Sequence, residues 1–334
     1  MSRRRYIIAL SCAFAVMVVT AVGSLVCGSV NIPLEDIFRI LTGGTPEKAT
    51  WGHIVMEIRL PAIITAVMAG VSLSVAGLLM QTVFANPLAG PSIMGVSSGA
   101  GLGVAVVVLL IGSTTGAVVG GAIVGAMAVV IVLVLLASIL RSGVMLLIVG
   151  ILLSYLTSSA ITLMNFAATE QSVHTYVLWG MGTFSDTSWE QMPVPILITA
   201  AAVVASVLMA KDLNAMLMGE RYAANIGVNI PRLRASALLC AGILTAVTTA
   251  YCGPVAFIGL AVPHIARLAL GSTNHHRLIP LTILCGAATA LLTLWICALP
   301  SQWGLLPVNA ITPLIGVPVI VYIILNRRRI AYFN

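Results

Sequence analysis

The stretch KDLNAMLMGERYAANIGVNIPRLR, residues 211–234, indicates the architecture of this chain because it is charged and its surroundings are not. Only 7% of the 334 residues are charged. Long apolar runs flank the stretch on both sides, and a segment this polar is costly to place in hydrocarbon. We therefore expect a structured loop on one face of a membrane protein. Its six charged residues are Lys211, Asp212, Glu220, Arg221, Arg232 and Arg234.

Composition predicts that the rest of the chain is a bundle of membrane-spanning helices. Hydrophobic residues make up 60% of it, more than a soluble core needs. Backbone groups in lipid must be hydrogen-bonded within the protein, which leaves helices or a closed barrel. The run AIVGAMAVVIVLVLLASIL, residues 122–140, lacks the alternating period of barrel strands, so helices are favoured. The basic N-terminal flank resembles that of a signal peptide, but the apolar core is too long, and we expect a retained span.

Apolar length predicts an all-α polytopic membrane protein, with ten transmembrane elements in a single domain over residues 1–334. The eighth element is too short to cross fully at 1.5 Å per residue, and it follows Pro254 and contains Pro263. Broken helices persist in membranes where protein buries them or where they line a cavity, so this element is expected to face a pathway. A simple kinked span is the alternative. The ten elements are expected at about 6–28, 60–83, 92–111, 117–140, 145–166, 193–210, 235–252, 255–267, 280–298 and 308–325.

Charge distribution tests this topology, in which both termini and residues 211–234 lie on one side. Thirteen of the 16 Lys and Arg residues then fall on that side, and the positive-inside rule makes it cytoplasmic. None of the nine acidic residues falls mid-membrane, whereas ion-coupled carriers usually need carboxylates there. Energy for transport is therefore expected from elsewhere. The outer side holds Arg39, Lys48 and Arg59.

Three blocks carry a resemblance to a known family. They read AGVSLSVAGLLMQTVFANPLAGPSIMGVSSGAGLG at 69–103, MGERYAANIGVNIPRLR at 218–234 and CGPVAFIGLAVPHIARLALG at 252–271. Small residues in the first block, among them Gly70 and Gly77, should let helix backbones approach closely. In this order and spacing the blocks resemble the FecCD-type permeases, which are membrane subunits of bacterial ABC importers for iron-siderophore complexes, haem and cobalamin.

The resemblance implies an assembly as well as a fold. The chain is expected to be the ten-helix subunit of a type II ABC importer in the bacterial inner membrane, with both termini cytoplasmic. It implies a homodimer in membrane lipid, two cytoplasmic ATPase subunits and an external substrate-binding protein. No nucleic-acid partner is expected.

The family's coupling element, a pair of short helices that docks in a groove of the ATPase, maps onto about 213–228. Gly219 and Gly227 are expected to mark helix ends in this segment, as capping glycines do. Apolar side chains could fill the groove, with charged ones at its rim, and a plain amphipathic interfacial loop is the alternative. The expected coupling residues are Met218, Gly219, Glu220, Arg221, Tyr222, Ala223 and Gly227, with Met216, Leu217 and Ile226 as further groove fillers.

Two turns resemble the family's cytoplasmic gate. They contain Asn86 and Leu88 after the second span, and Ser142, Gly143 and Val144 at the start of the fifth. A constriction of small and apolar residues can close the path of a bulky solute without binding it tightly. Ordinary tight turns are the alternative interpretation.

Several single residues also receive predicted roles. Arg59 resembles a family arginine that pairs with glutamates on the binding protein, so it is the expected docking residue. His264 is expected to hydrogen-bond local backbone, with metal ligation as the alternative, and His275 is expected in a solvated turn. The six cysteines form no CxxC pair and are expected to be buried hydrophobes; neither a metal nor a cofactor is expected. Residues that could line the pathway on the second span are Met68, Ser72, Met80 and Gln81.

The predicted function is transport without catalysis. The chain has no GxxxxGK[ST] phosphate loop, so it is not expected to hydrolyse ATP by itself. We predict the permease subunit of an ATP-driven importer for a bulky metal chelate, with an iron-siderophore favoured over cobalamin or haem. A secondary transporter is the rival class, followed by a channel or a structural membrane protein.

Overall fold

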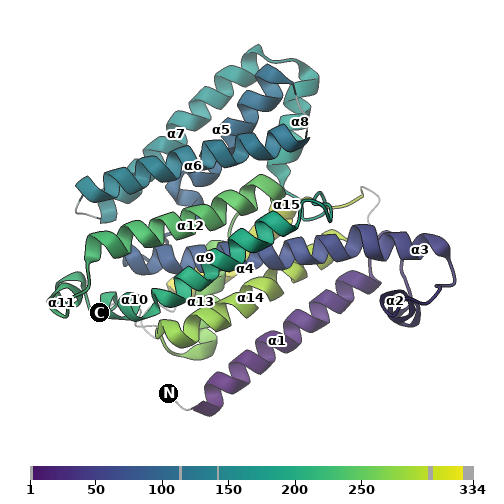
Figure 1. The fold of residues 1–334 in the computed structure, drawn as a ribbon, viewed down its shortest axis with the longest axis horizontal. Helices are drawn as coiled ribbons and strands as arrows, with labels where there is room; N and C mark the ends of the chain where they lie inside the picture. Colours follow the sequence, from purple (N-terminus) through teal and green to yellow (C-terminus); the bar gives the residue numbers. More distant parts are fainter. Residues whose placement is uncertain (1–2, 113–114, 141–142, 300–303, 326–334) are drawn as a thin grey trace.

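The computed structural model describes residues 3–112, 115–140, 143–299 and 304–325, and every regular element in those ranges is helical (Figure 1). Six helices are long and apolar enough to cross a membrane, and the bent pair α9 and α10 can act as a seventh span. With three shorter apolar helices, the described residues contain up to ten elements, close to the predicted number, and the all-α polytopic fold is confirmed. The elements are α1 Arg3–Val26, α2 Leu34–Leu41, α3 Ala49–His53, η1 Ile54–Arg59, α4 Leu60–Val83, η2 Pro91–Met94, α5 Val96–Ala105, η3 Val106–Ile111, α6 Thr115–Ile139, α7 Gly143–Ala167, α8 Glu170–Met181, α9 Pro193–Leu208, α10 Ala210–Met216, α11 Glu220–Asn225, α12 Ile230–Cys252, α13 Ile258–Leu270, α14 His275–Cys297 and α15 Val308–Leu325.

α4 is the central helix of the bundle. It continues α3 and η1, so that Ala49–Val83 forms one helix of 35 residues. At about 1.5 Å per residue this helix is roughly 50 Å long, which exceeds the ~30 Å of a hydrocarbon core. In the most apolar 18-residue stretch of this helix, 78% is buried inside the protein. The corresponding shares for α1 and α7 are 17% and 22%. The fold therefore surrounds α4 with protein and leaves α1 and α7 at the periphery (Figure 1).

Two clusters of buried side chains meet on α4. One cluster joins α4 to α5, α6, α7 and α12, and includes Leu79 and Leu244. The other joins α4 to α13 and α14, with α1 packed against it, and includes Leu73 and Leu278. Because both clusters share one helix, a shift of α4 would disturb the packing on both of its sides.

Glycines bring the backbone of α4 directly against its neighbours. A methyl group added at Gly77 would overlap the carbonyl oxygen of Gly259 on α13, and one at Gly70 would overlap that of Gly286 on α14. α5 and α6 also cross through glycines on both helices. Packing between close backbones is a main source of helix association in lipid, where apolar burial contributes little. The close approach predicted at Gly70 and Gly77 is confirmed.

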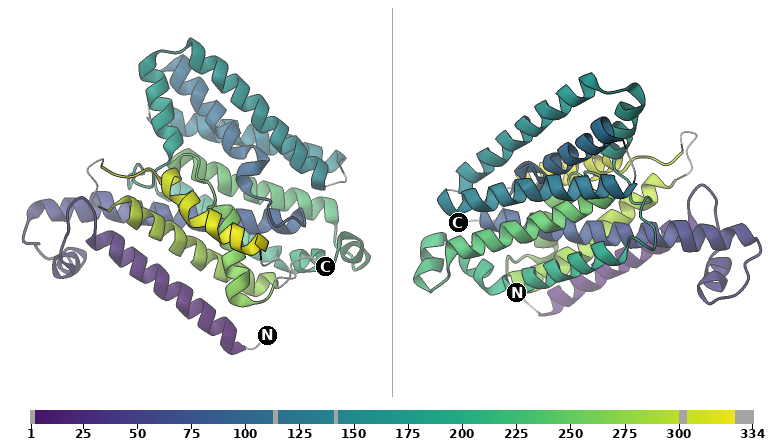
Figure 2. Two further views of the ribbon diagram at one scale, coloured as in Figure 1. Left: turned by 180° about the vertical axis from the view of Figure 1, so that it is seen from behind. Right: turned by 45° about the horizontal axis from the view of Figure 1, so that its top comes forward.

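The helix ends define two faces of the molecule. The start of α1, the segment α10–α11 and the start of α14 lie at one end, which we call the basic end (Figures 1 and 2). There Arg5 donates hydrogen bonds to the carbonyls of Leu268 and Ala269, both at 3.3 Å. α2 and α3 lie at the opposite end, which we call the α2 end (Figure 2). Most of the described Lys and Arg residues belong to segments at the basic end.

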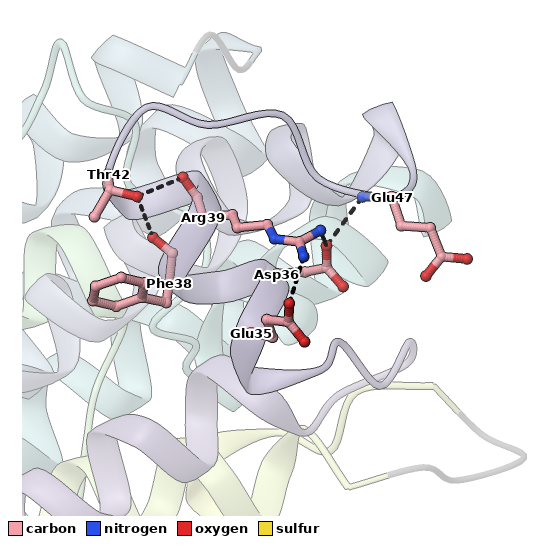
Figure 3. A network of polar contacts seen from close by, with 6 residues as sticks. All are labelled: Glu35, Asp36, Phe38, Arg39, Thr42 and Glu47. Atoms are coloured by element: carbon pink, nitrogen blue, oxygen red, sulfur yellow. Dashed lines mark hydrogen bonds and ion pairs between the residues drawn. The ribbon is translucent and has the colours of Figure 1, made fainter.

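The α2 end contains a short helix that the span prediction did not include. α2 buries one face in a small apolar cluster with α3 and exposes Phe38 on another face. Arg39 pairs with Glu35 and with Asp36, and Asp36 Oδ1 accepts a hydrogen bond from the backbone N–H of Glu47 at 3.0 Å (Figure 3). These bonds connect α2 to the chain that leads into α3, so the α2 end is a folded structure.

Most predicted spans lie within a few residues of the observed helices, and α15 begins at the predicted residue, Val308. The second span differs most, because its helix begins at Ala49 and continues through Pro61. Just before this proline η1 is wound as a π-helix, a local adjustment of the kind that lets membrane helices tolerate a missing N–H. The predicted short eighth element is α13, which follows the non-helical Phe257 with its positive φ of 65°.

Gly77→Ala should destabilise the protein by about 1–3 kcal/mol, the usual cost of forcing extra atoms into a packed core. The added methyl group would overlap the Gly259 carbonyl. Gly120→Ala is the matched control, because no neighbouring atom lies within 4 Å of the new methyl group. The control should keep or raise stability, since alanine favours helix more than glycine does. Thermal unfolding of the purified variants in detergent measures both effects, and equal melting temperatures would contradict the packing.

Candidate functional site

α10 and α11 form the segment for which a coupling role is predicted. The chain bends by 52° between α9 and α10, so it changes direction at the basic end. Gly219 and Gly227 flank α11 with positive φ angles of 101° and 93°, a backbone conformation that glycine adopts without steric cost. The two glycines therefore bound the second short helix, as the sequence predicts.

The segment from α10 to Ile226, just after α11, buries some of its apolar side chains and exposes others. Met218, Tyr222 and Ile226 are 69%, 50% and 57% exposed. Met216 and Ala223 are buried against the rest of the chain. The prediction that these last two contact a partner is therefore wrong, because a short helix lying on a bundle must cover the bundle with its inner face. The exposed apolar residues remain available to a partner.

Glu220 and Arg221 differ in their surroundings although they are adjacent. Glu220 Oε1 accepts a hydrogen bond from Arg234 at 2.6 Å, and the side chain of Arg234 is 5% exposed while that of Glu220 is 50% exposed. Arg234 lies near the start of α12, so this ion pair fastens α11 to α12. Arg221 is exposed. Glu220 thus holds the segment in place, and Arg221 presents its charge at the surface.

The chain turns sharply after α4, over residues 84–90. Ala85 has a positive φ of 45°, and Asn86 Oδ1 accepts a hydrogen bond from the backbone N–H of Leu88 at 2.9 Å. His264 on α13 hydrogen-bonds the carbonyl of Pro87 through Nε2 at 2.7 Å. This is the backbone contact predicted for His264, and it holds the 84–90 turn against α13.

The second predicted gate segment lies beside the first. A methyl group at Gly143 would lie 3.2 Å from Cδ1 of Phe84, so the start of α7 contacts the 84–90 turn. Val144 is exposed next to it. Ser142, the third residue of the prediction, lies outside the described residues. The structure thus brings together two segments that are far apart in the sequence.

The residues predicted to line a pathway are buried inside the protomer. Met68, Ser72, Met80 and Gln81 are all at most 6% exposed. A path between two copies of the chain would run along an exposed face of each copy, so this burial contradicts the predicted role. The physical reason is that these four side chains lie where α4 packs against other helices, whereas its partly exposed positions include Ile63, Val67 and Val71.

Arg59 is also buried. Its guanidinium donates hydrogen bonds to the carbonyls of Leu25 and Val30, which ties the end of α1 to the start of α4. The side chain borders a cavity of about 150 Å³ that Ser24 and Ser185 also line. Arg59 is therefore held by its own chain, and its docking role stays a prediction.

His275 corrects another prediction. It is 1% exposed and begins α14, where a solvated turn was expected. The preceding Asn274 caps this helix by accepting a hydrogen bond from the backbone N–H of His276 at 3.0 Å. An Asn directly before an apolar run is a helix-start signal, which could have placed His275 in the first turn. Sequence reasoning also assigned no role to Asn214, which contacts His275.

Comparisons with known proteins agree with this arrangement. The model of the FecCD transport family matches residues 16–326. The hemin transport system permease protein HmuU of Yersinia pestis is 30% identical over 322 residues, 93% of each chain. The molybdate import system permease protein MolB of Haemophilus influenzae is 30% identical over 328 residues, 94% of each chain. A solved structure described as a metal-chelate type ABC transporter in an inward-facing conformation matches with a TM-score of 0.85 and 27% identity, covering 95% of this chain and 98% of that one.

Glu220→Gln should loosen α11, because the buried Arg234 loses a carboxylate partner. The expected loss of free energy holding α11 in place is about 1–3 kcal/mol, which lies between the values for exposed and for buried ion pairs. Hydrogen exchange of the amides in 220–228 should accelerate about tenfold, which corresponds to ~1.4 kcal/mol. Arg221→Gln removes a neighbouring surface charge and should leave exchange unchanged. Equal exchange in the two variants would show that the ion pair does not hold α11.

Proposed function

Because this chain belongs to the FecCD transport family, we propose that it is the transmembrane permease subunit of an ATP-driven ABC importer. The family match and both relatives extend over nearly the whole chain, so the proposal concerns all ten elements as one transport domain. The chain is a transport subunit in this proposal, and ATP hydrolysis belongs to its partners.

The exposed apolar side chains in and beside α11 are the observation that carries the proposal. Met218, Tyr222 and Ile226 form an apolar surface beside the charge of Arg221 at the basic end. Such a surface suits insertion into a groove of a partner protein, with Met and aromatic side chains at the centre and Arg at the margin. The sequence contains no phosphate-binding loop, so an ATPase is the partner that supplies energy.

The proposed assembly contains two copies of the chain in the inner membrane. An ATPase subunit binds α10–α11 of each copy in the cytoplasm, and a substrate-binding protein faces the α2 end outside. The gathering of Lys and Arg at the basic end supports this orientation, with both termini cytoplasmic. The peripheral α7 exposes large apolar residues such as Leu156 and Leu163, which suits contact with lipid or with the second copy.

We propose a metal chelate as the cargo, with an iron-siderophore first and haem or cobalamin as alternatives. The hemin relative and the metal-chelate type structural neighbour support this class. The molybdate relative is equally similar to this chain, so identity near 30% is compatible with different cargoes.

Tyr222→Glu and Ile226→Glu should each reduce co-purification of the ATPase subunit at least tenfold. A carboxylate buried in an apolar groove lacks the partners that water provides, and truncating central contact residues commonly costs more than about 1 kcal/mol. Phe38→Glu is the matched control, because Phe38 is an exposed aromatic residue on α2 at the opposite end. Quantified pull-down from detergent-solubilised membranes measures binding. Retention of the ATPase by both α11 variants would exclude α11 as its docking site.

Uptake in proteoliposomes tests the function and the cargo together. With ATPase and binding protein present, uptake of a ferric siderophore should require internal ATP and stop when vanadate is added. Haem and cobalamin measured in parallel rank the three cargoes. Uptake that needs only a proton gradient, with no ATPase present, would overturn the proposal in favour of a secondary transporter.

A further inference from the structure

Polar contacts of the half-buried Asn214 connect α10 to the start of α14. Asn214 Oδ1 accepts a hydrogen bond from the backbone N–H of His275 at 2.7 Å, and it lies 3.0 Å from Nδ1 of the same residue. The Asn214 amide nitrogen lies 3.4 Å from Oδ1 of Asn274. One side chain on α10 thus holds two consecutive residues at the beginning of α14.

The imidazole of His275 extends this connection to the end of α4. Because the backbone N–H of His275 can only donate, the Asn214 atom that faces it is the oxygen, and Nδ1 must carry the proton that this oxygen accepts. In the neutral ring Nε2 is then an acceptor, and Thr82 Oγ1 lies 2.8 Å from it. The single hydroxyl proton of Thr82 has two acceptors within reach, this nitrogen and the Leu78 carbonyl at 2.9 Å. Both His275 and Thr82 are buried, so water does not replace these contacts.

Thr82 lies in the last turn of α4, directly before the 84–90 turn. Its carbonyl accepts a hydrogen bond from the backbone N–H of Ala85 at 3.2 Å, and the carbonyl of Gln81 accepts one from Asn86 at 3.1 Å. A displacement of the last turn of α4 is therefore passed on through backbone bonds to Asn86, the residue that shapes the turn with Leu88.

The opposite side of the turn is held by α13. His264 binds the Pro87 carbonyl, and Gln81 accepts a hydrogen bond from Arg267 and donates one to the carbonyl of Leu260 at 3.1 Å. The 84–90 turn therefore has two supports. α13 provides one directly, and α10 provides the other through Asn214, His275 and Thr82.

We propose that Asn214 is a positioning residue that links the coupling segment to the predicted gate, through His275 and Thr82. A movement of α10 pulls on the start of α14 and on the end of α4, and so changes the conformation of the 84–90 turn relative to α13. The inference rests on the proposed role of α10–α11 as the ATPase dock. Spatial intermediacy alone does not establish coupling, so the test must measure an effect at a distance.

Hydrogen exchange of the full-length protein in nanodiscs provides this test without any partner. Asn214→Ala and Thr82→Val should each accelerate exchange of the amides in 84–90 about fivefold, because each variant removes side-chain hydrogen bonds of this connection. The double variant should exchange no faster than either single one, because both break the same connection. Thr82→Ser keeps the hydroxyl and should retain slow exchange.

Ser206→Ala is the matched control. It removes a buried hydroxyl that contacts Cys240 at 3.2 Å between α9 and α12, away from the 84–90 turn, and should leave that turn unchanged. If Asn214→Ala accelerates exchange only within 210–216, its role is local and the inference is wrong. Additive effects of Asn214→Ala and Thr82→Val would also overturn it, since independent contacts add.

Transport measurements separate this inference from the proposed function. In the reconstituted importer, Asn214→Ala should keep ATP hydrolysis and lose at least half of the uptake per ATP, and Thr82→Ser should restore the coupling that Thr82→Val loses. Absence of ATP-driven uptake in the wild type would reject the proposed function and leave the exchange result standing. Normal coupling in both Asn214→Ala and Thr82→Val would reject the inference and leave the proposed function standing.

Discussion

Direct contact between the backbone of α4 and those of α13 and α14 is the constraint on which the rest of the structure depends. Gly77 and Gly70 allow the carbonyls of Gly259 and Gly286 to occupy space that any side chain would fill. In lipid, close packing replaces the hydrophobic effect as the force between helices, so these contacts determine which helices are neighbours. With α4 held on this side, the second cluster of apolar side chains can pack on its other side.

Polar contacts are concentrated at the two ends of this central helix. At the α2 end, Arg59 binds the carbonyls of Leu25 and Val30 and fixes the chain that follows α1. At the basic end, Thr82 and Gln81 bind His275 and Arg267, which belong to two other helices. A buried polar group without a partner is costly, so such contacts make the relative positions of the helix ends specific. The central helix thus has polar contacts at both ends, and these are the places where neighbouring segments can act on it.

Sequence reasoning located the segments of the candidate site better than it assigned the residues within them. Gly219 and Gly227 bound α11 as expected, because the need for positive φ is a local property of the chain. Ala223 and Met80 were assigned to surfaces but are buried, because one span or one short helix offers several faces and the sequence does not say which face meets a neighbour. His275 was expected in a solvated turn and is buried, because Asn274 begins a helix there.

The sequence by itself determined that the chain is a bundle of apolar helices, that one end is basic and that the 211–234 segment lies at that end. These properties follow from the free energy of transferring each short segment between water and lipid. That free energy depends mainly on the residues of the segment itself. Only the tertiary structure decided that α4 is central, that Glu220 holds α11 to Arg234, and that Asn214 meets His275. These contacts join segments distant in sequence, and they exist only after close packing has chosen the neighbours of each helix.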